Sequence, residues 1–147
     1  MTVYRITLAI WADQLVASGR AARWNTNGSF MIYSAANRAL ACLENIVHRG
    51  RIGSNESFRT VEIEIPAHLA ITEILKEDLP ADWRDYTSYP ISQALGDQWL
   101  HSNAGAVLKV PSAIIIDEFN YLINPQHSDF TSIKIKSILN FTFDGRL

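Results

Sequence analysis

Three short stretches of this 147-residue sequence carry side chains that could take part in chemistry. Arg23 lies beside a tryptophan in a turn-forming loop that ends at Gly28, and an arginine there can bind an anion. Glu44 falls at the margin of the apolar stripe of a predicted helix, where a partly desolvated carboxylate can meet a developing positive charge. Ser112 follows a proline at the end of an apolar segment. Each also has a plain structural explanation: a loop anchored to the core, a solvated helix flank, or a serine that satisfies backbone groups.

The usual catalytic signatures are missing from the sequence. The seven glycines form neither a GxGxxG nor a GxxxxGK[ST] phosphate loop, and the chain has no HExxH or GxSxG motif. The four histidines lie far apart, and the single cysteine, Cys42, falls within a predicted helix, so we expect a buried structural thiol and no metal site. The chemistry that remains uses arginine, tyrosine, a carboxylate and serine.

Composition and charge exclude several classes of function. The net charge of −2 and the scattered basic residues argue against direct nucleic-acid binding and against attraction to an acidic membrane. No apolar run approaches the roughly 20 residues that span a bilayer, and the first residues lack the layout of a signal peptide. With one cysteine, no intrachain disulfide can form. The sequence therefore predicts a cytoplasmic protein with no membrane association.

The hydrophobic pattern predicts more strands than helices. Apolar and β-branched runs predict strands over residues 3–10, 30–33, 58–65, 71–75, 106–110, 113–117 and 132–143, and the 3.6-residue period predicts helices over residues 36–49 and 90–103. Ser34 or Asn37 could cap the first helix, and Gly50 could end it. There is no repeat or linker. We expect an α+β fold in a single domain of residues 1–147, because the strands and helices do not strictly alternate.

Taken in order along the chain, these motifs resemble the RES domain, a family named for its arginine, glutamate and serine. The matching residues are Tyr4-Arg5, Arg23-Trp24-Asn25 followed by Gly28, Tyr33, Leu43-Glu44, Pro111-Ser112, residues 118–125, His127 and Asp129-Phe130. The resemblance runs from about residue 4 to residue 130. Two departures are visible: alanines precede Arg23 where many relatives carry glycines, and the chain is short between residues 56 and 86.

The resemblance implies a fold similar to that of ADP-ribosyltransferases, with mixed or antiparallel sheets and a few helices. It also implies a bacterial toxin that depletes NAD by cleaving the nicotinamide–ribose bond with water or phosphate as nucleophile. NAD would be the substrate and no cofactor would be required. The partner would be a cognate antitoxin with an Xre-type helix-turn-helix region, and a homodimer is possible. Two alternatives stay open: an ADP-ribosyltransferase that modifies a protein or nucleotide, and a noncatalytic binding module.

The resemblance also implies roles for five residues. The catalytic residues would be Glu44, Arg23 and Ser112, with Glu44 facing the positive charge that develops on the ribose. Arg5 and Arg23 would form bidentate hydrogen bonds with the pyrophosphate. Tyr33 would offer a ring face to nicotinamide. Ser112 would orient Glu44, the carboxamide or the ribose. For Arg5 a strand-end salt bridge, and for Tyr33 core packing, are equally good explanations. Because Arg23 lies in a loop, its replacement is expected to leave stability nearly untouched.

Overall fold

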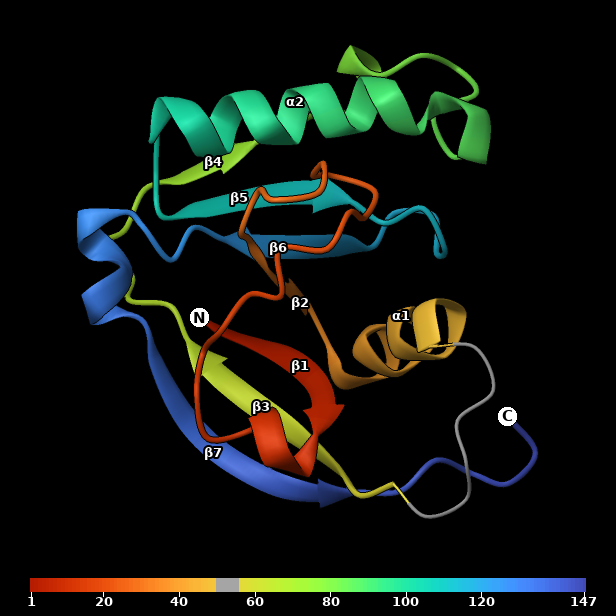
Figure 1. Ribbon diagram of the computed structural model, residues 1–147, viewed down its shortest axis with the longest axis vertical. Coiled ribbons are helices and arrows are strands. Elements are labelled where there is room, and N and C mark those ends of the chain that lie inside the picture. Colours follow the sequence, from red (N-terminus) through yellow and green to blue (C-terminus); the bar gives the residue numbers. More distant parts are fainter. Residues whose placement is uncertain (50–55) are drawn as a thin grey trace.

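The computed structural model describes residues 1–49 and 56–147, and within them seven strands form one sheet with two helices packed on it (Figure 1). The strands are β1 (Thr2–Leu8), β2 (Ile32–Ala35), β3 (Phe58–Glu64), β4 (Ile71–Glu73), β5 (Val107–Pro111), β6 (Phe119–Ile123) and β7 (Lys134–Phe141). The helices are α1 (Arg38–Arg49) and α2 (Tyr89–Ser102). The strand order is β4-β5-β6-β2-β1-β3-β7, and all neighbours are antiparallel except β4 and β5. The predicted α+β class with a mixed sheet is confirmed.

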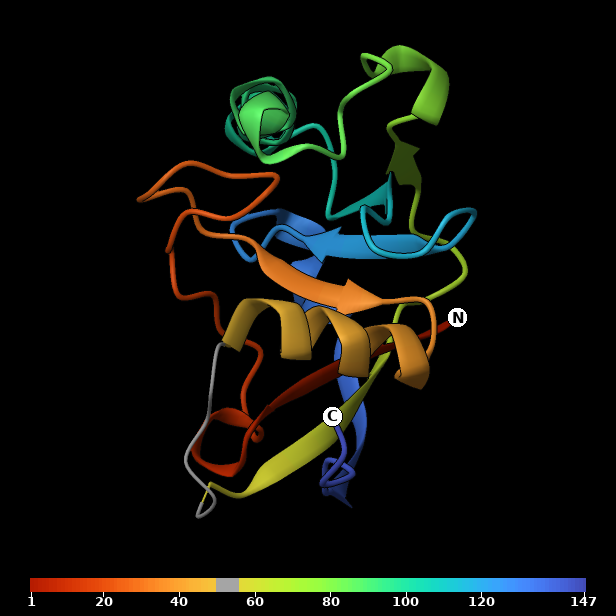
Figure 2. The ribbon, with the colours of Figure 1, turned by 90° about the vertical axis from the view of Figure 1, so that its right-hand side faces the viewer.

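The sheet consists of two halves that meet at β1 and β2. All seven residues of β1 pair with β3, and all four residues of β2 pair with β6, but β1 and β2 share only the pair Tyr4 and Ala35. The two strands therefore diverge on either side of this pair. Helix α1 follows β2 directly and lies beside both strands (Figures 1 and 2). This divergence is the structural basis of the pocket described below.

Each helix covers its own part of the core. Helix α2 buries Trp99 and Leu100 against a cluster that includes the fully buried Leu108 of β5 and Leu122 of β6. Helix α1 buries its Leu40 and a neighbouring alanine in a second cluster between α1, β1 and β3. The side chains that follow along α1, among them Glu44 and His48, line the pocket described below.

The start of α1 shows which of the two possible caps is used. The Asn37 side-chain oxygen accepts a hydrogen bond from the Leu40 N–H at 2.8 Å, as an N-cap does. Ser34 instead donates to the Tyr121 carbonyl at 2.7 Å. The predicted stop at Gly50 lies outside the described residues.

One predicted strand is wrong and another is displaced by two residues. Residues 113–117 form the turn between β5 and β6, because the Ser112 hydroxyl accepts the N–H groups of residues 114 and 115 and Asp117 has a φ of 64°. The next strand, β6, begins only at residue 119. The strand expected over residues 30–33 begins only at Ile32, and Phe30 is 44 % exposed, since the chain before it is still part of a loop closed by the Gly28 N–H on the Gly19 carbonyl. The other predicted elements differ from the structure by at most two residues at either end.

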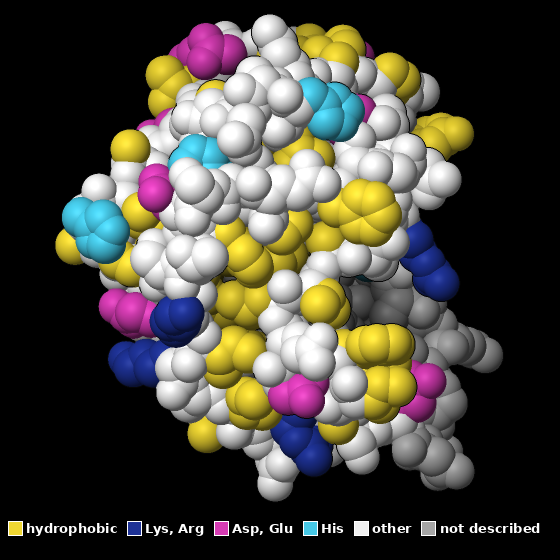
Figure 3. Space-filling model, turned by 60° about the vertical axis from the view of Figure 1, so that its left-hand side comes forward, with side chains coloured by type: hydrophobic (Ala, Val, Ile, Leu, Met, Phe, Trp, Pro, Cys, Tyr) yellow, Lys and Arg dark blue, Asp and Glu magenta, His cyan; other side chains and the backbone are white. Residues whose placement is uncertain are grey.

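The surface shows no concentration of basic side chains on the face in Figure 3, where lysines and arginines are scattered among apolar and acidic groups. Among the described residues, no helix has both the length and the apolar character needed to cross a membrane.

Candidate active site

A pocket of about 420 Å³ opens where β1 and β2 diverge. Its walls come from β1, β2, α1, the loop at residues 22–24, the start of α2 and the turn at residues 113–114. Arg5, Arg23, Tyr33 and Glu44 all line it. Ser112 reaches the site through a contact with Glu44. The structure therefore brings all five residues named from the sequence to one place, although they span more than a hundred positions along the chain.

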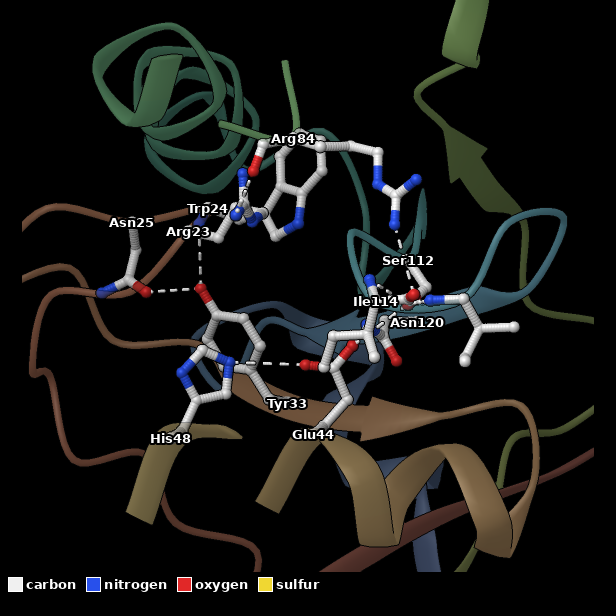
Figure 4. Close-up of polar contacts among 11 residues, drawn as sticks. Arg23, Trp24, Asn25, Tyr33, Glu44, His48, Arg84, Ser112, Ile114 and Asn120 are labelled. Atoms are coloured by element: carbon white, nitrogen blue, oxygen red, sulfur yellow. Dashed lines mark hydrogen bonds and ion pairs between the residues drawn. The ribbon is translucent and has the colours of Figure 1, made fainter. Parts of the chain in front are cut away.

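Glu44 projects from α1 and is held by three neighbours (Figure 4). Its Oε1 accepts hydrogen bonds from the Asn120 side-chain amide at 2.6 Å and from the Ser112 hydroxyl at 3.3 Å. Its Oε2 lies 3.3 Å from Nε2 of His48, one helical turn later. The Glu44 side chain is 23 % exposed, so the carboxylate is largely withdrawn from water but still lines the pocket.

The surroundings of Glu44 keep it ionised. Burial by itself raises the pKa of Glu44, but the polar contacts with His48, Asn120 and Ser112 outweigh burial and hold the pKa below its ordinary value. The pocket therefore contains a fixed negative charge at neutral pH. A carboxylate fixed in this way can stabilise positive charge on a bound molecule without first reorganising.

Arg23 is held on the other side of the pocket. Its Nη1 and Nη2 donate to the carbonyls of Trp83 at 2.9 Å and Arg84 at 3.0 Å, and its guanidinium lies 4.4 Å from the centre of the Tyr89 ring. These contacts join the loop to a segment some sixty residues away. The expectation that Arg23 has little structural role is therefore wrong, since its replacement breaks two hydrogen bonds and a cation–π contact.

Arg5 projects from β1 into the same pocket. Its Nη1 donates to the Val16 carbonyl at 2.9 Å, and burial lowers the pKa of Arg5, although a guanidinium stays charged at neutral pH. In the described part of the chain, neither Arg5 nor Arg23 has a carboxylate within 4.0 Å. The alternative of a strand-end salt bridge for Arg5 is thus not observed. Two partly buried cations without acidic partners favour an anionic ligand.

Tyr33 combines a ring in the pocket wall with an engaged hydroxyl. The hydroxyl donates to the Asn25 side-chain oxygen at 2.6 Å and accepts from the Trp24 N–H at 3.2 Å, while burial raises the pKa of Tyr33. The Asn25 amide in turn donates to the carbonyls of Arg20, Thr26 and Ser29 at 2.9 to 3.1 Å. Tyr33 therefore offers its ring rather than its hydroxyl to a ligand, and its hydroxyl fixes the loop that carries Arg23.

Helix α2 supports this loop from the outside. Ser92 donates to the Arg23 carbonyl at 2.7 Å, and Gln93 donates to the Ala22 carbonyl at 2.9 Å. At Gly96 the helix approaches the loop so closely that an added Cβ would lie 1.8 Å from the Trp24 carbonyl oxygen. Only glycine permits this contact, so the close packing of α2 fixes the position of the loop beside the pocket.

Two residues that contact Glu44, His48 and Asn120, were not identified as site residues from the sequence. The spacing of four residues between Glu44 and His48 on a helix was a usable signal, because it places both side chains on one face. Asn120 lies within the motif at residues 118–125, but only the pairing of β6 with β2 shows that it reaches Glu44. Within the described residues, no three histidine, cysteine, aspartate or glutamate side chains are grouped so as to hold a metal ion.

Comparisons with known proteins identify the family and agree with the fold. The RES domain model matches residues 2–144. A Prs ADP-ribosylating toxin from Sphingobium sp. (strain YBL2) is 38 % identical over 141 residues, covering 92 % of this chain and 88 % of that protein. A protein named Toxin Res from Yersinia enterocolitica is 35 % identical over 126 residues, covering 85 % and 82 %. A crystal structure of the M. tuberculosis MbcT–MbcA toxin–antitoxin complex superposes with a TM-score of 0.76 at 18 % identity, covering 96 % of this chain and 84 % of that one. The predicted resemblance is thereby confirmed, and the chain belongs to the RES-domain family of toxins.

Proposed function

We propose that this toxin depletes cellular NAD by cleaving the bond between nicotinamide and ribose. The observation that carries the proposal is an ionised, immobilised Glu44 in a pocket that also contains two arginines without acidic partners. NAD matches this arrangement because it combines a ribose that becomes cationic when nicotinamide leaves with a pyrophosphate that is already anionic. NAD is the substrate in this proposal, and no separate cofactor is invoked.

Glu44 would act on the ribose. When the C1′–N bond breaks, nicotinamide departs with the bonding electrons as a neutral molecule, and positive charge spreads over the ribose. A general acid is not needed, because the quaternary nitrogen already makes nicotinamide a good leaving group. One fixed electrostatic contact of this kind is worth about 3–4 kcal/mol of barrier, or roughly 10²–10³ in rate. Ser112 and Asn120 would serve this step by keeping Glu44 Oε1 in place.

The arginines would bind the pyrophosphate in place of a glycine-rich loop. A planar guanidinium donates two parallel hydrogen bonds to phosphate oxygens, and Arg5 and Arg23 present such groups from different walls of the pocket. The ring of Tyr33, held by Asn25, would pack against nicotinamide. The catalytic assignment is thus Glu44 supported by Ser112, with Arg23, Arg5 and Tyr33 in substrate binding.

A transferase remains the second candidate because the relative from Sphingobium, at 38 % identity, is named an ADP-ribosylating toxin. Transfer begins with the same bond cleavage, but the ribose is then attacked by a group on a protein or nucleotide. The two reactions differ in one observable: hydrolysis releases nicotinamide from NAD alone, whereas transfer needs an acceptor.

We also propose that a cognate antitoxin binds this chain, because the structural neighbour was solved in a toxin–antitoxin complex. The family resemblance points to an antitoxin of the Xre type. An antitoxin that inserts into the pocket would block NAD binding directly.

Expression in bacteria tests the proposal. Induction of the wild-type chain should arrest growth and lower cellular NAD, and the Glu44→Gln variant, expressed to the same soluble level, should do neither. Co-expression of a cognate antitoxin should restore growth. Normal growth with unchanged NAD at confirmed soluble expression of the wild-type chain would contradict the proposal.

A further inference from the structure

His48 contacts the oxygen of the reactive carboxylate that Asn120 and Ser112 do not bind. Oε1 of Glu44 is already fixed by Asn120 and Ser112, whereas Oε2 contacts His48 alone among the described residues. His48 belongs to the last turn of α1 and lines the pocket, and its side chain is 53 % exposed. The imidazole therefore contacts the carboxylate and is also exposed to solvent, so a second reactant can reach it (Figure 4).

The contact with Glu44 also orients the imidazole. A carboxylate next to Nε2 favours the tautomer in which Nε2 carries the hydrogen, and this leaves Nδ1 with a free lone pair. In the described part of the chain, Nδ1 of His48 has no hydrogen-bonding partner. Histidine is the side chain most often used to accept a proton in catalysis, and a carboxylate that fixes its tautomer is the usual companion.

We propose that His48 is a further catalytic residue: the general base that takes the proton from the nucleophile attacking the ribose. This inference rests on the proposed NAD cleavage. In the step, the C1′–N bond breaks and nicotinamide leaves with its electron pair, while a water oxygen forms the new bond to C1′. The proton of that water passes to Nδ1 of His48, and the products are nicotinamide and ADP-ribose. Glu44 thus stabilises the cation and orients the base.

The proposal has a consequence for the choice of nucleophile. A base is useful only to a nucleophile that must lose a proton, such as water or the hydroxyl of an acceptor. An anion such as azide attacks without losing a proton, so it bypasses His48 but still needs Glu44. Replacing His48 should therefore slow the reaction with water but not the reaction with azide. Replacing Glu44 should slow both.

The experiment measures nicotinamide release from NAD by the full-length chain carrying His48→Gln, with and without sodium azide. Glutamine can still donate a hydrogen bond to Glu44 Oε2 but cannot accept the proton, so a merely positioning role is preserved and a base role is lost. We expect hydrolysis to fall by about 10²-fold. Azide should raise nicotinamide release to within about tenfold of the wild-type rate, and mass spectrometry should identify ADP-ribosyl azide as the product. Sodium chloride at equal concentration controls for ionic strength.

Two matched variants complete the test. His68→Gln makes the same change at an exposed histidine outside the pocket and should leave hydrolysis unchanged. Glu44→Gln should be slow with water and azide alike. Wild-type hydrolysis by His48→Gln, or a slow reaction that azide does not accelerate, would overturn the role of His48 while leaving the proposed function intact. Failure of the wild-type chain to release nicotinamide would instead contradict the proposed function itself. Melting curves confirm that each variant is folded.

Discussion

Replacing Glu44 by glutamine removes a charge while keeping nearly the same shape. The amide oxygen can still accept the hydrogen bonds from Asn120 and Ser112, so the side chain should remain in place. Loss of the negative charge removes about 3–4 kcal/mol of transition-state stabilisation, which corresponds to a rate lowered roughly 10²–10³-fold. A hydrogen bond to a charged group is worth about 1 kcal/mol more than a neutral one, so the free energy of unfolding should fall by about 1 kcal/mol, mainly through the short Asn120 contact.

The assay is kcat for nicotinamide release at saturating NAD, together with a denaturant unfolding curve for each protein. Glu73→Gln is the matched control, because Glu73 forms an ion pair with Lys109 at 2.8 Å outside the pocket. This control should keep full activity. If Glu44→Gln is folded and retains kcat within threefold of wild type, Glu44 does not stabilise the cation and the reasoning is refuted.

Three further perturbations test other parts of the structure. Arg5→Lys and Arg23→Lys should each raise KM for NAD with little change in kcat, because a point charge cannot form the bidentate fork; steady-state titrations with unchanged KM in both variants would remove the pyrophosphate clamp. Gly96→Ala should destabilise the fold by about 1–3 kcal/mol, because its Cβ meets the Trp24 carbonyl, and an unchanged melting temperature would contradict this close contact. Since the folded-state pKa of Glu44 is lowered, its ionisation stabilises the fold fully above about pH 4.3 and loses this effect as the pH falls through the folded-state pKa. Unfolding curves of wild type and Glu44→Gln should therefore converge in acid, and a constant difference down to about pH 2 would count against the lowered pKa.

The fold was predictable where the side-chain pattern reflects burial. The alternation from Phe58 to Ile65 predicts β3 because buried and half-buried residues follow one another along it. The strand predicted from the apolar run at residues 113–117 is wrong for the opposite reason, because these residues are not buried in the sheet. Ile116 is 60 % exposed, and the Ser112 hydroxyl binds the N–H groups that a strand would have paired. Local composition does not reveal that a side chain has taken over the hydrogen bonds of the backbone.

The site was predictable as a set of residue types but not as a set of contacts. The family resemblance brought Glu44 and Ser112 together, and the structure shows that they touch. The partners of Arg23, by contrast, lie sixty residues further along the chain, and Asn120 reaches Glu44 only through the order of the strands. Such long-range pairings follow from the tertiary fold, so no local pattern could have indicated them.

Incubation of the purified chain with NAD alone tests the central claim most directly. The measurement is the amount of nicotinamide released over time, separated by chromatography, with no acceptor protein present. We predict multiple turnovers that yield equal amounts of nicotinamide and ADP-ribose, and their loss in Glu44→Gln. Intact NAD after prolonged incubation with folded wild-type protein, both with and without inorganic phosphate, would contradict the claim that this pocket cleaves NAD.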